Sequence, residues 1–420
     1  MTTDRPDPSV DTVVLGAGIV GVSVAAHLAK RGRSVVLVDR RLPGEEASFG
    51  NGGLIQREGV FPHAFPHSIP DILRYGLNRQ NDVRYHPLAL LQVAPFLLSY
   101  WRNSSPQRYL ALVRQYAKLI EHSVAEHQTL AEAADASHLL KSGGWLRAFR
   151  TQKARDTRLQ QAEVMRSEFG LNYRSLDAVA LQREEPYLAP LMIGAIDWTD
   201  PFRIESPHAL TMAYFALFQK LGGHFVQGDA RTFAADGRGW QVTTANGIIR
   251  AGSAVVALGA AAPDVTIPLG YNLPLAVKRG YHMHYSPAGD AKLNRPVLDT
   301  EGGYLLSPNV RGIRLTTGIE FALRDAPRTP VQLGVVEPLA RSLFPLASRL
   351  DPEPWMGLRP CTPDMMPIIG PAPRHSGLWF AFGHAHHGLT LGPVTGRLIA
   401  EMMTNETPFV DPAPFDPRRF

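Results

Sequence analysis

Six residues near the start of the chain, Gly16-Ala-Gly-Ile-Val-Gly21, have the GxGxxG spacing that lets a backbone turn hold a diphosphate. An apolar run over residues 11–15 precedes them, and helical periodicity over residues 20–31 follows them. In such a strand–turn–helix unit the first glycine makes the turn, the second admits the diphosphate, and the third lets the helix pack closely on the sheet. We therefore expect the helix N-terminus to face the phosphates of a dinucleotide.

An acidic residue stands where this motif needs one. Residues 34–38 form a second apolar strand, and Asp39 at its end can accept hydrogen bonds from ribose hydroxyls. Arg40 and Arg41 follow and raise the question of NADP, but a carboxylate at the strand end repels a 2′-phosphate. The residues of this unit that we predict to bind a dinucleotide are Gly16, Ala17, Gly18, Ile19, Val20, Gly21, Asp39 and Arg40.

The composition narrows the function classes. At 420 residues the chain exceeds what one hydrophobic core usually supports, so two domains are expected. It has no long Lys/Arg run and no zinc-ligand spacing, so we expect neither a nucleic-acid partner nor a metal site. The modest net charge of +5 suits an anionic cofactor and an anionic substrate. Because Cys361 is the only cysteine, the chain can form neither an intrachain disulfide nor a CxxC redox pair.

No segment has the pattern of a targeting or membrane-spanning sequence. Residues 1–9 are polar and rich in proline, and no apolar run approaches the length of a transmembrane helix. A cytoplasmic location is therefore expected. Residues 86–101 are very apolar, which favours a core helix but also suits a surface that makes peripheral contact with the inner face of a membrane.

The rest of the chain alternates between helical and strand-like patterns. Helices are expected over residues 88–101, 109–130, 207–221 and 393–403. Strands are expected over residues 143–151, 194–199, 225–226, 254–258, 280–285, 303–306, 312–321 and 378–382, with a hairpin over residues 240–250 that turns at Asn246-Gly247. The mixture predicts an α/β protein.

Distinctive blocks of residues are spread over nearly the whole chain. They are residues 46–54 (EASFGNGGL), 278–282 (KRGYH), 356–364 (MGLRPCTPD), 367–370 (PIIG), 383–390 (GHAHHGLT) and 414–420 (PFDPRRF). Together with the Gly16–Gly21 turn, these blocks resemble the FAD-dependent D-amino-acid oxidase superfamily, in particular bacterial D-amino-acid dehydrogenases and the similar glyphosate oxidoreductase. The resemblance implies FAD as the cofactor and oxidation of an amine as the reaction.

The resemblance also implies which segments would surround the FAD. The loop from Ala47 would wrap the pyrophosphate and the flavin ring, with Ser48 offering a hydroxyl and Gly52-Gly53 offering backbone N–H groups. A helix with Pro393 at its first position would direct its positive end at the reduced flavin. The residues implied to contact FAD are Ala47, Ser48, Asn51, Gly52, Gly53, Leu54, Ala230, Ala257, Gly259, Gly383, His384, Gly388, Leu389 and Thr390.

A substrate that carries both an amine and a carboxylate calls for an arginine, because the planar guanidinium fork matches a carboxylate. Arg359 matches the family position that clamps this carboxylate, although it could instead pair with Asp364. Tyr304 matches a pocket tyrosine that assists it, and Tyr281 is a weaker candidate, as is Arg279, which could simply tie the domains together. His386 is either a substrate contact or a structural histidine of its turn; many D-amino-acid dehydrogenases have threonine there.

The leading function is oxidation of the C–N bond of a D-amino acid to an imine, which hydrolyses to a 2-oxo acid and ammonia, with oxygen or a quinone as electron acceptor. One alternative is cleavage of a secondary amine such as an N-substituted glycine of the glyphosate or sarcosine type. Another is a non-catalytic flavoprotein subunit of an electron-transfer complex. The expected fold has a Rossmann-type FAD-binding domain and a substrate-binding domain with a mixed antiparallel sheet. The first would comprise residues 1–60, 196–268 and 353–420, and the second residues 61–195 and 269–352.

Overall fold

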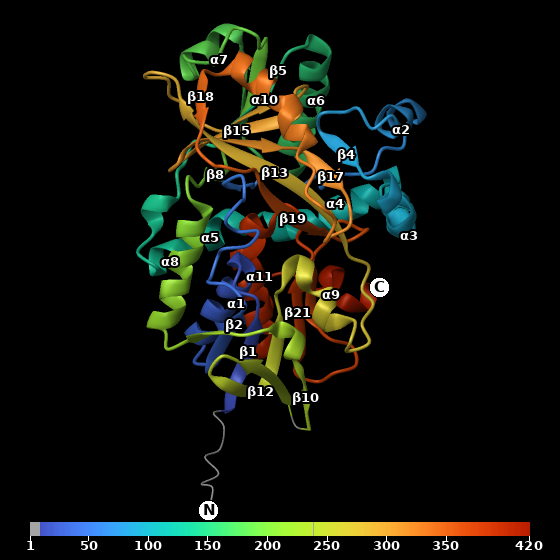
Figure 1. Ribbon diagram of the computed structural model, residues 1–420, viewed down its shortest axis with the longest axis vertical. Helices are drawn as coiled ribbons and strands as arrows, with labels where there is room; N and C mark the ends of the chain where they lie inside the picture. The colour runs from blue at the N-terminus through green and yellow to red at the C-terminus, as the bar shows by residue number, and fades with distance from the viewer. Residues whose placement is uncertain (1–8, 238) are drawn as a thin grey trace, which may run out of the picture.

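The computed structural model describes residues 9–237 and 239–420, so the proline-rich start of the chain lies outside the described residues. Two sheets organise the fold. Figure 1 shows the smaller sheet in the lower half of the molecule, the larger sheet in the upper half, and the start of α11 (Gly388–Met403) close to the level at which they meet. A two-stranded ribbon, β3 (Leu54–Ile55) with β8 (Phe202–Arg203), completes the strand pairing.

The smaller sheet has a parallel centre formed from distant parts of the chain. Its strand order is β10-β11-β12-β1-β2-β9, with β21 pairing β12 and β20 pairing β21. The strands are β1 (Ser9–Leu15), β2 (Val35–Asp39), β9 (His224–Gln227), β10 (Ala234–Asp236), β11 (Gly239–Thr244), β12 (Gly247–Val256), β20 (Ile368–Pro371) and β21 (Leu378–Phe382). The parallel pairs β1–β2, β1–β12, β2–β9 and β12–β21 make this the predicted Rossmann-type unit.

The larger sheet is mostly antiparallel, as predicted. Its strand order is β4-β17-β13-β16-β15-β14-β5-β7-β6, with β18 and β19 also pairing β13. The strands are β4 (Val83–Tyr85), β5 (Trp145–Phe149), β6 (Tyr173–Asp177), β7 (Gly194–Trp198), β13 (Ala276–Pro287), β14 (Val297–Asp299), β15 (Tyr304–Asn309), β16 (Gly312–Thr317), β17 (Ile319–Phe321), β18 (Leu346–Arg349) and β19 (Trp355–Cys361).

Helices cover both sheets. They are α1 (Ile19–Lys30), α2 (Ile69–Gly76), α3 (Pro87–Asn103), α4 (Pro106–Ile120), α5 (Ser123–Ala133), α6 (Gln152–Phe169), α7 (Ala178–Glu184), α8 (Pro207–Lys220), α9 (Pro263–Thr266), α10 (Val331–Leu343) and α11. Helices α1 and α11 pack tightly together, because a Cβ on Gly396 would lie only 2.6 Å from the Ser23 carbonyl oxygen. This close crossing brings the start of α11 to the glycine turn that precedes α1.

The strand–turn–helix–strand unit around Gly16–Gly21 is confirmed as β1, α1 and β2. Gly16 has φ +106°, and a Cβ there would lie 2.5 Å from the Ala257 carbonyl oxygen. A Cβ on Gly21 would lie 1.8 Å from the Gly16 carbonyl oxygen. The first glycine therefore serves the turn and the third serves close packing, as their positions in the motif predict.

Three element boundaries differ from the predicted ones. The helix expected over residues 109–130 is two helices, α4 and α5, and α5 packs on α8 and α11. The hairpin strand and the strand expected over residues 254–258 are one strand, β12, because its first half pairs with β11 and its second half with β1 and β21. The strand expected over residues 312–321 divides into β16 and β17, because Ile319 donates its N–H to the Asp82 carbonyl beside β4.

Helix α11 begins five residues before the predicted start, so Pro393 lies inside it and the prediction of proline at the first position was wrong. Proline has no N–H, so the Leu389 carbonyl four residues earlier lacks its usual helical donor. The Nε2 atom of His127 on α5 lies 2.8 Å from this carbonyl oxygen, which it can reach as a donor. A side chain from another helix thus replaces the missing bond and lets α11 extend to Gly388.

Two strands lie in the larger sheet although the expected boundaries at residues 196 and 353 assign them elsewhere. β7 begins at Gly194 and pairs with β5 and β6, and β19 begins at Trp355 and pairs with β13. The division of the chain into two domains at these residues remains a prediction.

The bond between His127 and Leu389 can be tested by His127→Phe, which keeps a ring of similar volume but removes the donor. His127 is fully buried, so the variant leaves a buried carbonyl without a partner. We expect the free energy of unfolding to fall by about 1–3 kcal/mol, measured by urea denaturation. His138→Phe, at an exposed position, is the matched control. Equal stability of the two variants would show that α11 does not need this bond.

Candidate functional site

A cavity of about 2460 Å³ is bordered by residues from both sheets. One end is lined by Asp39, Arg40 and Ala230, and the other by Arg359, Lys278 and residues around His386. Of the residues predicted to bind cofactor or substrate, those that line the cavity are Gly16, Gly18, Ile19, Val20, Asp39, Arg40, Ala47, Ser48, Asn51, Gly52, Leu54, Ala230, Ala257, Gly259, Tyr281, Tyr304, Arg359, His384, His386, Gly388 and Leu389.

The Asp39 carboxylate is held at the first end of the cavity by backbone groups. Its Oδ2 accepts the N–H of Ala17 at 2.7 Å, and its Oδ1 accepts that of Arg41 at 3.1 Å. Burial raises the pKa of Asp39, and these two N–H groups oppose the rise. Arg40 and Arg41 both pair with Glu46, at 3.0 and 3.1 Å. Each Asp39 oxygen retains a lone pair that can accept a hydroxyl of a ribose.

The glycine turn leaves room for a ligand. A Cβ on Gly18 would meet only Ser48 Oγ, at 3.4 Å, so this position opens onto the cavity. Ser48 Oγ accepts the N–H of Ile19 at 2.9 Å, which fixes the serine at the start of α1. The N-terminus of α1 and that of α11, at Gly388, both adjoin the cavity. Two helix N-termini and an open glycine fit a cofactor that carries a diphosphate and an electron-rich ring.

Five predicted cofactor residues lie behind the cavity wall instead. They are Ala17, Gly21, Gly53, Gly383 and Thr390. Gly53 donates its N–H to Asn51 Oδ1 at 3.0 Å, and a Cβ on it would lie 2.2 Å from the Ile204 carbonyl oxygen. The Gly53 N–H thus has an acceptor in the protein, and its approach to a flavin stays a prediction. Thr390 Oγ1 accepts the Gln56 N–H at 3.1 Å, so it joins α11 to the segment after β3.

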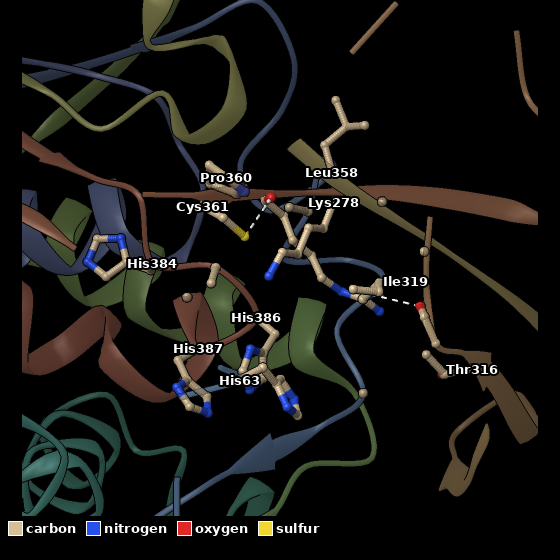
Figure 2. A pocket seen from close by; sticks show the side chains of 18 of the residues that line it. His63, Lys278, Thr316, Ile319, Leu358, Pro360, Cys361, His384, His386 and His387 are labelled. Atoms are coloured by element: carbon tan, nitrogen blue, oxygen red, sulfur yellow. Dashed lines mark hydrogen bonds between the residues drawn. The ribbon is translucent and has the colours of Figure 1, made fainter. Parts of the chain in front are cut away.

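Two cations lie side by side at the other end of the cavity. Lys278 of β13 and Arg359 of β19 are directly paired in the antiparallel register, so their side chains share one sheet face. A Cβ on Gly280 would lie 2.5 Å from Arg359 Nη2, so the absence of a side chain there makes room for the guanidinium. Arg359 Nη1 donates to the Gly318 carbonyl at 2.9 Å, and Lys278 Nζ donates to Tyr100 Oη at 2.9 Å. Figure 2 shows Lys278 in the pocket, close to Cys361.

No carboxylate neutralises these cations within 4.0 Å in the described part of the chain. Arg359 therefore does not pair with Asp364, which is bound by Arg419 at 2.6 Å. Burial lowers the pKa of Arg359, because a charged guanidinium is less stable inside the protein than in water. The pair can accept one carboxylate of a ligand.

The two candidate tyrosines do not join this pair. Tyr304 donates its hydroxyl to the Leu339 carbonyl of α10 at 3.2 Å and packs in the core beneath that helix. Tyr281 donates to Glu320 at 2.9 Å and accepts from Arg279 at 2.8 Å in a buried network on the opposite face of β13. Both hydroxyls have protein partners, and a role for either tyrosine in holding a substrate carboxylate stays a prediction. Arg279 is structural, bonding Glu320 at 2.7 Å.

Histidines form the wall opposite the cations. The ring centroids of His386 and His63 are 4.9 Å apart, and Figure 2 shows the two rings side by side. Burial and the neighbouring charges hold the pKa of His386 well below its usual value, and burial lowers that of His63 to about 3. Both imidazoles are therefore neutral near pH 7. His384 instead bonds Thr395 at 2.9 Å.

The titratable cavity residues that were not predicted include His63, Glu58, Lys278 and Arg147. Trp145 Nε1 and Gln56 Nε2 both donate to Glu58 Oε1, at 2.8 and 3.1 Å. Burial raises the pKa of Glu58 to about 7. The available signal for Arg147 was a charged residue inside the otherwise apolar segment WLRAF, because such a residue must face something other than the core.

Known proteins resemble this chain over almost its full length. A family model described as "FAD dependent oxidoreductase" matches residues 11–402. A D-amino-acid oxidase of Bradyrhizobium diazoefficiens is 29% identical, over 97% of this chain and 98% of that one. A D-amino acid dehydrogenase of Chromohalobacter salexigens is 28% identical, over 98% of this chain and 100% of that one. The crystal structure of L-proline dehydrogenase from P. horikoshii has the same fold, with a TM-score of 0.75 at 21% identity over 99% of this chain and 98% of that one.

The buried carboxyl of Glu58 gives a pH test of the site. Its pKa is about 7 in the folded protein against an ordinary 4.5, so its contribution to stability is complete below pH 4.5 and is lost as the pH rises through 7. Glu58→Gln removes this titration, and we expect it to gain stability relative to the natural protein between pH 5 and pH 8, by up to about 3 kcal/mol. Urea unfolding at several pH values measures the difference. The same trend for the exposed Glu132→Gln would refute the assignment.

Proposed function

The chain belongs to the family of FAD dependent oxidoreductases, whose model matches residues 11–402, and from this membership we propose that it oxidises the C–N bond of a D-amino acid. The product is an imine, which water hydrolyses to a 2-oxo acid and ammonia. The protein is thus an oxidoreductase with FAD as its cofactor. The names of two full-length relatives, a D-amino-acid oxidase and a D-amino acid dehydrogenase, support the substrate class.

One observation carries the proposal: Lys278 and Arg359 face the cavity together without a carboxylate partner among the described residues. Burying a charge is costly unless an opposite charge accompanies it. A substrate carboxylate would supply that charge, with the Arg359 fork aligning its plane and the Lys278 ammonium adding a second donor. Fixing the carboxylate fixes the α-carbon that bears the amine. The bond between Arg359 and the Gly318 carbonyl holds the fork in place.

Lys278 and Arg359 also favour the neutral form of the substrate amine. A hydride can leave only a carbon whose amine is neutral, and positive charges nearby lower the pKa of a bound ammonium group. The wall of neutral histidines, His63 and His386, adds no competing negative charge and can accept an N–H of the amine. FAD, when bound, supplies the acceptor for the hydride. The chain itself therefore binds and orients the substrate and favours its neutral amine, whose proton passes to solvent water.

Arg359→Ala should lower kcat/KM for the best amino acid by about 30-fold to several thousand-fold, since losing one partner of a buried charge pair costs about 2–5 kcal/mol. Arg359→Lys should recover part of this loss, because it keeps the charge without the fork. The measurement is anaerobic bleaching of the bound FAD with a panel of D- and L-amino acids and N-alkylglycines, which also separates primary from secondary amines.

FAD content should stay normal in both variants, because Arg359 is assigned to the substrate. Arg349→Ala is the matched control, since this half-exposed arginine belongs to the same sheet but pairs with Glu337 outside the cavity. Near-normal kcat/KM in Arg359→Ala would remove the carboxylate clamp and with it the case for an amino acid. Failure of every amine to bleach the FAD would instead favour a non-catalytic flavoprotein subunit.

Helices α2 and α3 expose several large apolar side chains. Figure 1 shows these two helices projecting from the same side of the molecule. The segment expected as a core helix buries only Ala89 and Tyr100, whereas Leu88 is 83% exposed and Leu91 81% exposed, so that expectation was wrong. Exposed Arg74 and Arg102 lie on the same two helices. No helix within residues 9–237 and 239–420 is both long and apolar enough to cross a membrane.

We propose that this surface rests on a membrane with anionic lipids and that the acceptor is a membrane quinone rather than oxygen. Burying a leucine in lipid is favourable by about 1.5–3 kcal/mol, and arginines near anionic lipid add to the attraction. The protein should therefore sediment with vesicles of phosphatidylglycerol, and the double substitution Leu88→Ser/Leu91→Ser should weaken binding at least tenfold. Val310→Ser, exposed on the larger sheet, is the control. Unchanged sedimentation of the double variant would exclude this contact surface.

A further inference from the structure

Among residues 9–237 and 239–420, no carboxylate forms an ion pair with Arg147 within 4.0 Å. It lies in the middle of β5, on the face where Trp145, Ile196 and Leu298 also line the cavity. Its Nε atom is buried without a hydrogen-bond partner, and in the described chain its guanidinium forms no ion pair within 4.0 Å. Its contact is with the Trp145 ring, whose centroid lies 5.5 Å from the guanidinium carbon. Burial lowers the pKa of Arg147 to about 10, still well above neutrality. The side chain therefore carries an uncompensated charge.

Other buried arginines of the same sheet are paired. Arg279 bonds Glu320 at 2.7 Å, and Arg295 bonds Asp197 at 2.9 Å. The carboxyl group whose charge acts on Arg147 is Glu58, and its Oε1 accepts hydrogen bonds from Trp145 and Gln56. Burial raises the pKa of Glu58 to about 7, so the carboxyl is mainly protonated below that pH. Below about pH 7 Glu58 is therefore mainly neutral and does not compensate the charge of Arg147. An uncompensated buried cation that faces a cavity indicates that an anion enters from outside.

The Arg147 position is separate from the Lys278–Arg359 pair. Strands β14, β15 and β16 lie between β5 and β13. Four strand spacings of about 4.8 Å put the backbones about 19 Å apart along the sheet. One carboxylate cannot bridge both positions. Burial is the largest cause of the lowered pKa of His63, and the charges of four cations lower it further: Lys278, Arg147, Arg158 and Arg359. A molecule bound beside His63 therefore lies near the cations at both ends.

The FAD phosphates do not explain this cation. The open glycine Gly18 and Ser48 belong to the turn of the smaller sheet and its neighbouring loop, whereas Arg147 belongs to the larger sheet beside Trp145. Arg158 of α6 also lines the cavity, and its charge acts on Arg147. Arg147 and Arg158 thus form a second cationic region of the cavity, separate from Lys278 and Arg359.

We propose that Arg147, assisted by Arg158, forms a second anion site, and that the substrate is an amine carrying two anionic groups. One carboxylate would bind Lys278 and Arg359, and a second, distal anionic group would bind Arg147. The inference rests on the proposed amine oxidation and narrows its substrate class to amino-dicarboxylates and their equivalents. A substrate with an uncharged side chain would leave Arg147 unpaired in the closed cavity.

Binding of unreactive dicarboxylates tests the second site without any oxidation. Succinate, glutarate and adipate are titrated into the FAD-loaded protein by calorimetry, each against its own monoamide, which has the same shape and one charge fewer. At least one dicarboxylate should bind at least tenfold more tightly than its monoamide. Arg147→Gln should abolish that preference by weakening the dicarboxylate alone, and Arg147→Lys should retain part of it. Arg359→Ala should weaken both ligands.

The control is Arg166→Gln, which removes one charge from the exposed face of α6, where the arginine pairs with Glu163. It should leave every affinity unchanged. Equal affinities of each dicarboxylate and its monoamide, no binding of any dicarboxylate, or a preference that survives in Arg147→Gln would overturn the second site. The comparison of each dicarboxylate with its monoamide in the natural protein already tests the second site, so the test does not depend on whether a variant folds.

The two proposals fail in different ways. If an amino acid bleaches the FAD while dicarboxylates show no advantage, the second site is wrong and the amine oxidation stands. If no amine bleaches the FAD while the Arg147-dependent preference remains, the oxidation is wrong and the chain binds a dianion for another purpose.

Discussion

The antiparallel pairing of β13 with β19 is the interaction on which the site depends. It joins strands that are distant in the sequence and sets Lys278 directly opposite Arg359. The same strand carries Arg279 on its other face, where Glu320 neutralises it. Side chains alternate between the faces of a strand, so a shift of one residue in register would exchange these roles. Strand β13 therefore carries a structural charge, Arg279, on one face and a charge available to a ligand, Lys278, on the other.

The two ends of the cavity handle negative charge by different means. At the glycine turn the available donors are backbone groups at the start of α1, which carry only partial charge and cost little to bury. Around His63 the donors are full cations, Lys278, Arg147 and Arg359. Such unpaired charges destabilise the protein on its own, and any anion that binds them stabilises the folded state in proportion to its concentration. Ligand affinity and stability are therefore linked at this end.

The sequence was informative where the structure is local. The glycine turn, the acid at Asp39 and the strands around them lie within about thirty residues, so their spacing was enough to predict the unit. The start of α11 was misplaced because a side chain from α5 compensates for Pro393, which no local pattern reveals. The hydroxyls of Tyr304 and Tyr281 donate to groups on other elements, which no local pattern reveals. Arg147 and His63 were missed because only the assembled sheet and its facing loop bring them to one cavity.

The cavity is lined by residues that are far apart in the chain, so its wall is completed only when the later segments have been synthesised. Gly16 and Gly18 are synthesised before the wall formed by His386, Gly388 and Leu389, which lies about 370 residues later in the chain. Helix α11 also packs on α1, so the nascent N-terminal unit has an uncovered helix until then. A cavity that can retain the cofactor therefore requires α11, and a chain truncated before α11 lacks this part of the wall.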